Sequence, residues 1–320
     1  MKNIINRAFT AKKKILFVLA AVCLFAASSW AQSCTYDTQD LTINFKRKPA
    51  GLLENGEFSV SATKKVAFAG GNLQYNKSTG KWKIMDHQYD VVETDGSVGT
   101  DYASQDVVTL FGWGTAGNSE ATGAYQPYAT SETNTEYVKY LTAAGEWTAS
   151  KSDWGVVNSG DLGAGWRTLT TDEWGHLFSR TGDKASTVNG TANRTYTKAT
   201  INTDGTPVKG IILFPDGGTF AASEFTEVGS PNTGNVNYTT TCTIAQWTAL
   251  EGKGCVFLPI AGLRIGKGVS DVGSYGGYWS SSAFSATDAY VLVFTSGNVN
   301  PRNYLNRSRG FSVRLVQDVE

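Results

Sequence analysis

Alternating apolar and polar positions predict a protein built mainly from short strands. The pattern begins near Phe58 with FSVSA and KVAFA, and it continues in GNLQYNKSTGKWKIM, which predicts two strands around a turn at residues 76–80. Four further stretches near the C-terminus have the same character: GCVFLPIAGLR, GGYWSSS, AYVLVFTS and GFSVRLV. Residues 32–57 lack sustained periodicity and contain one strand-like segment, LTINF, so we interpret them as an N-terminal tether.

Two segments carry the start signals of helices instead. In TLTTDEWGHLFSR, Thr170 and Glu173 have the spacing of a capping box, and in CTIAQWTALEGKG, Thr243 and Gln246 repeat it. Apolar residues follow at helical spacing in both segments. Residues 89–165 are rich in glycine, threonine, serine and aromatic residues, which predicts long ordered loops. The sequence therefore predicts an α+β domain over residues 58–320, with two helices packed on short antiparallel strands and long ordered loops.

The first 31 residues have the layout of an export signal. A cationic stretch precedes the apolar run ILFVLAAVCLFAA, and the small residues Ser29 and Ala31 offer a cleavage site. The apolar run is too short for a comfortable membrane span. We therefore expect an exported protein, at the cell surface, in the extracellular space or in the periplasm. Without residues 1–31 the chain carries 23 basic and 28 acidic residues, a net charge of about −5, which does not favour nucleic-acid binding.

Three cysteines remain after the signal, and their state stays open. Cys34 lies just past the cleavage site, where lipid-anchored proteins carry a modified cysteine, although the preceding AQS is a poor lipobox. Membrane attachment through a lipid anchor is therefore one alternative. Cys242 and Cys255 can form a disulfide in an oxidising compartment, or they can be two separate buried thiols.

No residue pattern predicts catalysis, a metal site or a cofactor. His87 and His176 are the only histidines, and neither has a partner at metal-ligand spacing. His176 lies in a predicted helix, so we interpret it as a polar surface residue. The glycine-rich stretches lack the spacing and the lysine of a phosphate loop, and no G-x-S-x-G elbow occurs. Asp172 and Glu173 are accounted for by the N-terminus of the helix, where negative charge is favourable.

The most specific pattern lies after Gly276. It reads Y-W-S-S, then A-Y-x-L-x-F-x-S, then R-x-x-G-x-S-V-R-L-V. This framework resembles the C-terminal part of the C-type-lectin-fold variable proteins of gut Bacteroidetes, which are targets of diversity-generating retroelements and are similar to the phage major tropism determinant. It is distantly similar to formylglycine-generating sulfatase-modifying domains. The likeness continues upstream through FSVSATKKVAFAGGNLQY, LFGWGTAG, GWRTLTTDEW and VFLPIAGLR, and so covers nearly all of the chain from Phe58.

The resemblance implies a C-type lectin-like fold whose variable segment, residues 280–314, divides into a frame and a displayed ligand-binding surface. The frame positions are Tyr278, Trp279, Ser280, Ser281, Ala289, Tyr290, Leu292, Phe294, Arg307, Gly310, Ser312, Val313 and Arg314. The ligand-binding positions are Phe284, Ser285, Thr287, Asp288, Val291, Val293, Thr295, Asn298, Asn300, Arg302, Asn303, Tyr304, Asn306, Ser308, Arg309 and Phe311. Strand alternation separates Val291 and Val293 from Leu292. Because both sets are apolar, only the resemblance assigns the valines to the ligand side.

The composition of this segment agrees with diversification through randomised template adenines. Asparagine codons mutated in this way cannot become Lys, Glu, Gln, Met or Trp codons. None of these five residue types occurs between Ser280 and Val316, a stretch of 37 residues, whereas they make up 41 of the 248 residues from Gln32 to Trp279. About six would therefore be expected in this stretch. The alternative is that strand-rich tails disfavour these residue types.

We therefore expect an exported, non-catalytic protein that binds a protein or glycan ligand on another cell, a phage or a host surface. Tyr, Ser, Asn and Arg suit this role because they combine aromatic contact with adaptable hydrogen bonding. The E-P-N and W-N-D signatures of calcium-dependent lectins are missing, so we expect metal-independent binding. One alternative is an enzyme on the sulfatase-modifying scaffold, which would need a cysteine-based site near the C-terminus, where this chain has no cysteine after Cys255. The other is a structural domain of a surface adhesin.

Overall fold

The chain divides into two compact units, residues 1–50 and 51–320. In this computed structural model the residues described in full are 51–92, 106–114, 153–178, 196–203, 206–220, 238, 241–266 and 268–319; four further strands are described by their backbone alone. In the first unit, β1 (Gln32–Tyr36) and β2 (Ile43–Arg47) pair antiparallel, and β2 overlaps the predicted strand LTINF at residues 43–45. The predicted export signal, residues 1–31, lies outside the described residues.

The second unit begins seven residues earlier than the sequence indicates. Residues 51–57, which the sequence assigns to the tether, are attached to the strand that ends at Phe68. The Gly70 amide donates a hydrogen bond to the Gly51 carbonyl over 2.7 Å, and the Leu53 amide donates to the Phe68 carbonyl over 2.9 Å. Periodicity alone could not show this attachment, because the segment forms single bridges rather than a regular strand.

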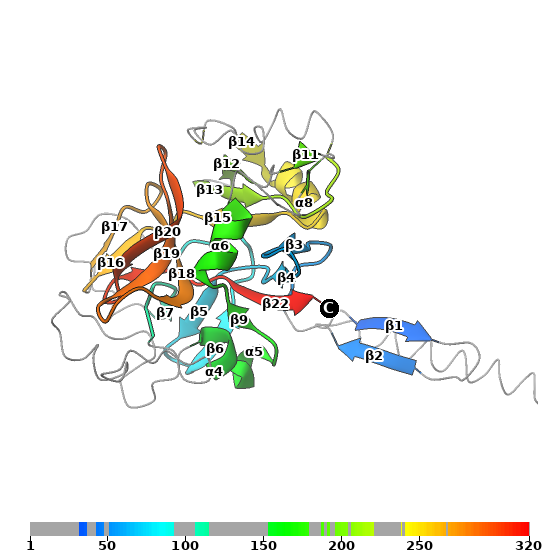
Figure 1. Cartoon of the computed structure of the whole chain (residues 1–320), viewed down its shortest axis with the longest axis horizontal. Helices are drawn as coiled ribbons and strands as arrows, with labels where there is room; N and C mark the ends of the chain where they lie inside the picture. Colours follow the sequence, from blue (N-terminus) through cyan, green and yellow to red (C-terminus); the bar gives the residue numbers. More distant parts are fainter. Residues whose placement is uncertain are drawn as a thin grey trace, which may run out of the picture. The chain divides into compact units, whose positions relative to one another are not determined.

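The second unit consists of short strands in several sheets, and most of the strand pairs are antiparallel (Figure 1). One sheet contains, in spatial order, β3 (Phe58–Ser59), β4 (Lys65–Phe68), β22 (Leu315–Val319) and β9 (Arg167–Thr168). A second contains β6 (Lys81–Ile84), β5 (Leu73–Asn76) and β7 (Val107–Val108). A third contains β17 (Gly268–Ser270), β16 (Leu263–Ile265), β21 (Gly310–Phe311) and β8 (Phe111–Gly112).

Two further sheets complete the arrangement. The fourth contains β14 (Thr241–Thr243), β12 (Tyr196–Asn202), β13 (Pro207–Leu213) and β15 (Val256–Pro259). The fifth, which we name the display sheet, contains β18 (Gly276–Ala283), β19 (Asp288–Phe294) and β20 (Val299–Asn306). The small strands β10 (Thr187–Val188) and β11 (Thr191–Ala192) pair with each other.

The helices of the described residues are α4 (Trp154–Val157), α5 (Ser159–Leu162), α6 (Thr171–Phe178) and α8 (Ile244–Gly252). Both predicted capping boxes are confirmed. The Glu173 amide donates to Thr170 Oγ1 over 3.2 Å while the Thr170 amide donates to Glu173 Oε2 over 2.8 Å, and Thr243 and Gln246 exchange the same two bonds. None of these helices has the length and apolar character of a membrane span.

Several predicted elements are divided or extended in the structure. The stretch GCVFLPIAGLR forms β15 and β16, and GFSVRLV forms β21 and β22, because the Ser312 amide leaves the β21 ladder and bonds to the Gly277 carbonyl over 3.1 Å. The helices α4 and α5 lie in the region predicted as loops. Asp153 caps α4 by accepting from the Gly155 amide over 2.9 Å, but four residues are too few to show helical periodicity.

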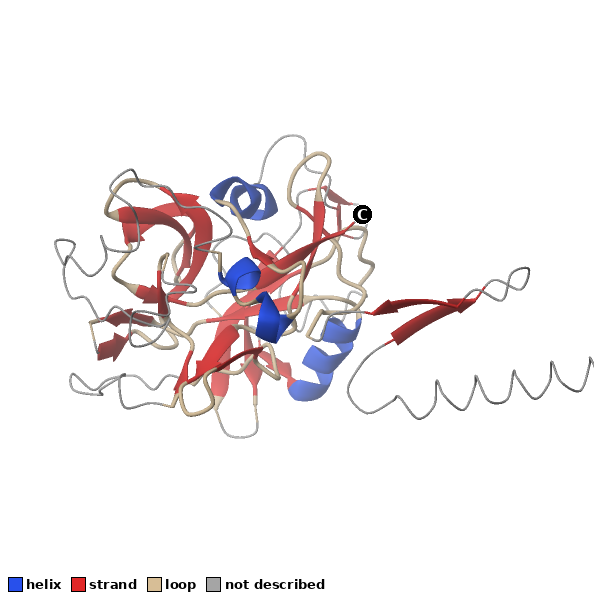
Figure 2. Ribbon diagram, turned by 90° about the horizontal axis from the view of Figure 1, so that it is seen from below, coloured by secondary structure: helices blue, strands red, loops and turns tan. Residues whose placement is uncertain are grey.

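The display sheet lies between two apolar clusters. Figure 1 shows α6 beside this sheet, and Figure 2 shows short helices against the strands of the second unit. On one face, Leu292 packs in a cluster with Trp174 and Leu177 of α6. On the other face, Val291 packs in a cluster with Trp154 and Trp166. Because both faces of the central strand β19 are covered, this sheet is part of the core of the second unit rather than an appendage.

Arg314 joins this core to the first strands of the unit. The side chain is fully buried, and its guanidinium donates to neutral oxygens only: Asn72 Oδ1 at 3.0 Å, the Ala69 carbonyl at 3.0 Å, Gln88 Oε1 at 3.3 Å and the Phe257 carbonyl at 2.8 Å. Burial lowers the pKa of Arg314 to about 10, which still leaves it charged at neutral pH. One cation thus fixes three separate chain segments against the C-terminal strand.

Replacing Arg314 with methionine is expected to lower the free energy of unfolding by about 3–5 kcal/mol, because it leaves several buried acceptors without a donor. Urea denaturation measures the difference. The matched control is Arg302→Met, which removes an arginine whose side chain is 59% exposed and should change the free energy by less than about 0.5 kcal/mol. Equal effects of the two substitutions would show that the buried network contributes little.

Candidate ligand-binding surface

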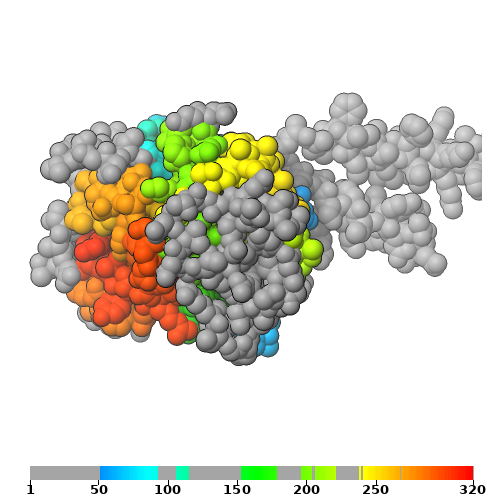
Figure 3. Space-filling view, turned by 90° about the horizontal axis from the view of Figure 1, so that it is seen from above, coloured from blue at the N-terminus to red at the C-terminus, as the bar shows by residue number. Residues whose placement is uncertain are grey.

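The segment predicted to be variable spans the display sheet and the strand β21 that follows it. In this sheet β20 is an edge strand, since it pairs with β19 alone, and Pro301 within it fits such an edge position. The C-terminal residues from about 265 onward, coloured orange to red, form a continuous area of the surface in Figure 3. The geometry therefore presents part of this segment to solvent and buries the rest.

The sixteen predicted ligand-binding residues fall into three groups by exposure. Exposed are Phe284, Ser285, Thr287, Asn298, Arg302 and Tyr304. Half-buried are Asp288, Thr295, Asn300, Asn303 and Arg309. Buried are Val291, Val293, Asn306, Ser308 and Phe311. The predicted frame positions are buried, except Tyr290, which is half-buried.

Val291 and Val293 are not displayed, which corrects the expectation for both. Their exposed fractions are 0% and 5%, and both belong to the cluster beneath the sheet, with Trp279 and Phe311. The physical reason is the apolar run Ala289–Phe294, which is buried on both faces. Such a continuous run is typical of a strand with two covered faces, and this was the signal in the sequence that could have predicted their burial.

Phe311, Asn306 and Ser308 are likewise corrected from the displayed set to the frame. The Phe311 ring packs edge-on against Trp279, with centroids 5.0 Å apart, and a side chain at Gly277 would overlap it. Asn306 is buried and donates to the Thr287 carbonyl over 3.3 Å, while its Oδ1 accepts from the Ser308 amide over 2.9 Å. All three side chains are buried beneath the exposed surface, and Asn306 holds the displayed turn through its bond to Thr287.

Three aromatic side chains, which we name the aromatic triad, form the most prominent exposed feature. Phe284 and Tyr304 stack face to face with centroids 3.8 Å apart and planes inclined by 9°, and Tyr290 meets Phe284 edge-on at 5.3 Å. Tyr290 and Tyr304 are direct partners across β19 and β20. The exposed fractions of Phe284 and Tyr304 are 45% and 50%, so a partner can cover a large aromatic area here.

The turn between β18 and β19 is held in one conformation beside the triad. Ser285 Oγ and Thr287 Oγ1 both donate to Asp288 Oδ2, over 3.0 and 2.8 Å. Arg307 lies beneath, with its guanidinium 4.5 Å from the centre of the Trp113 ring; it donates to the Asp288 carbonyl over 3.1 Å and to the Ser285 carbonyl. Burial lowers the pKa of Arg307 to about 10, so it stays charged at neutral pH and keeps these bonds.

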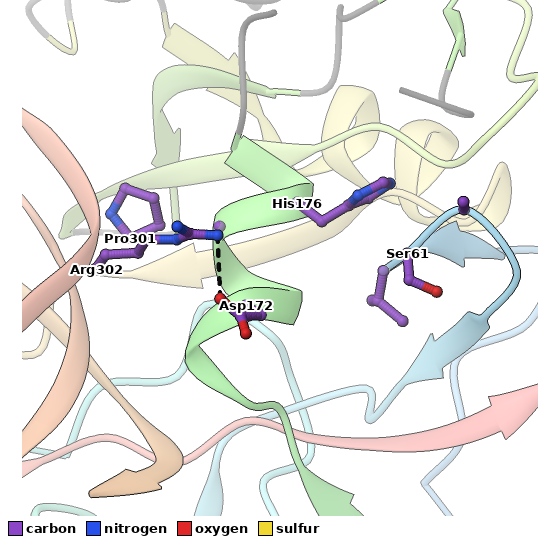
Figure 4. Close-up of a pocket in the computed structure, with 8 residues that line it drawn as sticks. Ser61, Asp172, His176, Pro301 and Arg302 are labelled. Carbon is purple, nitrogen blue, oxygen red and sulfur yellow. Dashed lines mark ion pairs between the residues drawn. The ribbon is translucent and has the colours of Figure 1, made fainter. Parts of the chain in front are cut away.

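A cleft of about 520 Å³, which we name the α6 cleft, lies beside β20 (Figure 4). Its lining residues come from α6, from β20 and from the loop after β3: Val60, Ser61, Ala62, Asp172, Gly175, His176, Pro301 and Arg302. Arg302 Nη2 lies 3.1 Å from Asp172 Oδ1, and both side chains are exposed, at 59% and 83%. Figure 4 shows Arg302 reaching across to α6 while His176 projects from the helix toward the loop that carries Ser61.

Of the residues that line this cleft, the sequence predicted only Arg302 as a site residue. Asp172 was interpreted as a helix-terminal charge and His176 as a polar surface residue, and the structure places both in the wall of the cleft. No local pattern could have revealed this, because the cleft depends on the contact between α6 and β20, which are more than 120 residues apart.

A small ionic network holds the N-terminus of α6, the helix that forms one wall of the cleft. Arg167 binds Glu173 through two nitrogens, at 2.8 and 2.9 Å, and also lies 2.6 Å from Asp318. Burial opposes the charge of Glu173, but the bonds from Arg167 and the Thr170 amide outweigh it, so the pKa of Glu173 is lowered. The hydrogen bond from Arg167 also lowers the pKa of Asp318. At neutral pH both carboxylates are therefore charged and hold the helix.

The tentative disulfide is not formed. Cys242 and Cys255 are buried thiols in the cluster that contains Trp247 and Phe257, which matches the second of the two predicted alternatives. Spacing in the sequence cannot choose between these states, because a disulfide needs a specific separation and direction of the two side chains. Among the residues that the structure describes, no group of three or more His, Cys, Asp and Glu side chains is arranged to hold a metal ion.

Comparison with known proteins identifies no relative of this chain. No protein-family model, no curated protein and no solved structure matches the chain.

Proposed function

We propose that this chain is an exported, non-catalytic ligand-binding protein with a C-type lectin-like fold, and that its display sheet presents a diversified surface to a protein or glycan ligand. The observation that carries the proposal is the aromatic triad. Exposed aromatic rings are costly in water and are enriched where a partner covers them. In this chain two such rings stack on each other within the one segment whose composition is that of a randomised surface.

The support beneath the triad favours binding as well. Arg307 and Asn306 fix the turn of residues 284–288 through bonds to its carbonyls, and β19 is packed on both faces. A surface on such rigid elements is pre-organised, so a ligand need not order it on binding. The exposed side chains can change while these supporting contacts remain.

The chemistry of the described residues accords with binding rather than with the alternative of an oxidase-like enzyme. Cys242 and Cys255 are buried among aromatic side chains, where a substrate does not reach. The hydroxyls of Ser285 and Thr287 donate to a carboxylate that fixes the turn, and no imidazole among their described contacts activates them as nucleophiles.

Truncating the stacked pair tests the proposal. Phe284→Ser and Tyr304→Ser are each expected to weaken binding at least tenfold, because anchor residues of this type contribute about 2 kcal/mol or more. Binding of the full chain is measured on arrays of immobilised oligosaccharides and of purified bacterial surface proteins. The control is Ile265→Ser on β16, which removes a side chain that is 47% exposed and lies outside the display sheet. Variants that bind as tightly as the unaltered chain would refute the proposal.

Removal of divalent metal provides a second test. The proposed surface consists of aromatic, hydroxyl, amide and guanidinium groups, so EDTA is expected to leave the affinity within about twofold on every probe that the chain binds. Surface plasmon resonance with and without EDTA measures this. Loss of binding in EDTA that calcium restores would point to a metal-dependent lectin instead.

Diversification predicts a pattern in DNA. We expect a near-copy of the DNA that encodes residues 280–314, next to a reverse transcriptase gene, with differences confined to adenines. Strain variation should concentrate at exposed positions such as Asn298, Arg302 and Tyr304, because changes at the buried Val291 and Phe311 disrupt the core. Genome sequencing of related strains tests this. A locus with neither the copy nor the variation would indicate an undiversified binding protein.

A further inference from the structure

We infer that the α6 cleft is a second part of the ligand-binding surface, and that it takes a neutral carbohydrate end group while the adjoining sugar lies on Tyr304. This inference rests on the proposed function and names its ligand class. Three observations carry it: the glycine beneath Arg302, the balanced charge of the cleft, and the position of the cleft and the aromatic triad on the same face of the display sheet.

Gly175 leaves room for Arg302 on the surface of α6. A Cβ atom at this position would overlap the Nε atom of Arg302, so the guanidinium lies directly against the helix backbone. Glycine inside a helix costs about 0.5–1 kcal/mol relative to alanine. The position of the Arg302 side chain therefore depends on Gly175. Helix α6 has a helix-destabilising glycine at the residue where the guanidinium needs room.

The charges of the cleft cancel. The Arg302 guanidinium and the Asp172 carboxylate pair at 3.1 Å, and just beyond them Lys64 Nζ lies 3.6 Å from Glu173 Oε1. A carboxylate or sulfate on the ligand would meet Asp172, and an ammonium group would meet Arg302. For an ionic ligand, attraction to one member of the pair is offset by repulsion from the other. A neutral ligand avoids the repulsion, so the electrostatics of the cleft favour a neutral ligand.

The same pair leaves donors and acceptors side by side. A guanidinium has five N–H donors and a carboxylate has two acceptor oxygens, whereas the ion pair between Arg302 and Asp172 joins one nitrogen to one oxygen. Ser61 and His176 add a hydroxyl and an imidazole to the wall. Neighbouring hydroxyl groups of a sugar each donate and accept, so a vicinal diol can bond to both members of the pair without separating them.

The cleft and the aromatic triad lie on the same face of the display sheet. Leu292 lies on the α6 face of the sheet, and alternation places Tyr290 on that face too, opposite Tyr304 of β20. Arg302, two residues before Tyr304, also lies against α6. A ligand that follows this face meets a polar cleft and then an aromatic ring, which matches the hydroxyl edge and the C–H face of successive sugars.

The shape of the site also favours a sugar over a folded protein. A volume of about 520 Å³ is that of a pocket for a compact group. A stable protein interface instead buries about 1,200–2,000 Å² over a broad surface. The observations therefore favour a glycan, and a protein ligand becomes an outcome of the test.

The experiment compares glycine substitutions in the full chain on an array of neutral, sialylated, sulfated and uronic-acid oligosaccharides, together with purified bacterial surface proteins. The unaltered chain is expected to bind a subset of the neutral oligosaccharides. Gly175→Ala should displace Arg302 and weaken that binding at least tenfold, as should Arg302→Ala. Gly160→Ala in α5 is the matched control, because a Cβ there meets no atom within 4 Å and binding should stay unchanged. Thermal melting should show that Gly175→Ala is as stable as the unaltered chain or more so.

The possible results separate this inference from the proposed function. Binding to charged oligosaccharides only, to proteins only or to no neutral oligosaccharide would overturn the inference, as would full binding by Gly175→Ala. If the chain captures a protein probe and no neutral oligosaccharide, and Phe284→Ser or Tyr304→Ser abolishes that capture, the proposed function stands while the carbohydrate inference fails. A third result is binding of neutral glycans that is lost in Arg302→Ala but unchanged in Phe284→Ser and Tyr304→Ser. This result would contradict both the proposed function and the placing of the adjoining sugar on Tyr304. It would support the cleft alone as the binding site.

Discussion

The buried guanidinium of Arg314 is the interaction on which the arrangement of the second unit depends. A cation in the core must receive acceptors from several directions, and here they come from the loop before β5, from Gln88 and from β15. These segments are far apart in the sequence, so they meet only when the C-terminal strand is in place. Arg314 follows the display sheet by eight residues, with β21 between them, so the end of this segment is fixed to the first strands of the second unit and to β15.

A second buried arginine, Arg307, binds carbonyl oxygens closer to the surface. Arg307 is buried over Trp113 and bonds to the carbonyls of the turn at residues 285–288, as Arg314 bonds to carbonyls in the core. Arginine suits both sites because its planar fork of donors satisfies several oxygens and remains charged when buried. Two arginines of the frame thus bind backbone carbonyls, and Arg314 also binds the side-chain amides of Asn72 and Gln88. None of these contacts involves an exposed side chain of the display sheet, so they do not depend on which side chains are displayed.

The sequence predicted those parts of the fold whose signals are local. The capping boxes at Thr170 and Thr243 identified α6 and α8, because a cap needs only residues three positions apart. The face of β19 was not predictable from alternation, since Val291 and Leu292 are equally apolar and both are buried. The α6 cleft is not predictable from the sequence for another reason. Its existence depends on a contact between Gly175 and Arg302 that no spacing along the chain encodes.

The burial of both faces of β19 also explains where a ligand surface can lie. Leu292 is covered by the cluster that contains α6, and Val291 is covered by the second cluster. Among the described residues of the sheet, exposed side chains of the predicted site therefore lie on the edge strand β20, at Arg302 and Tyr304. The aromatic and the polar contacts of the surface therefore meet along β20, where Tyr304 is exposed and Arg302 lies against Gly175 of α6.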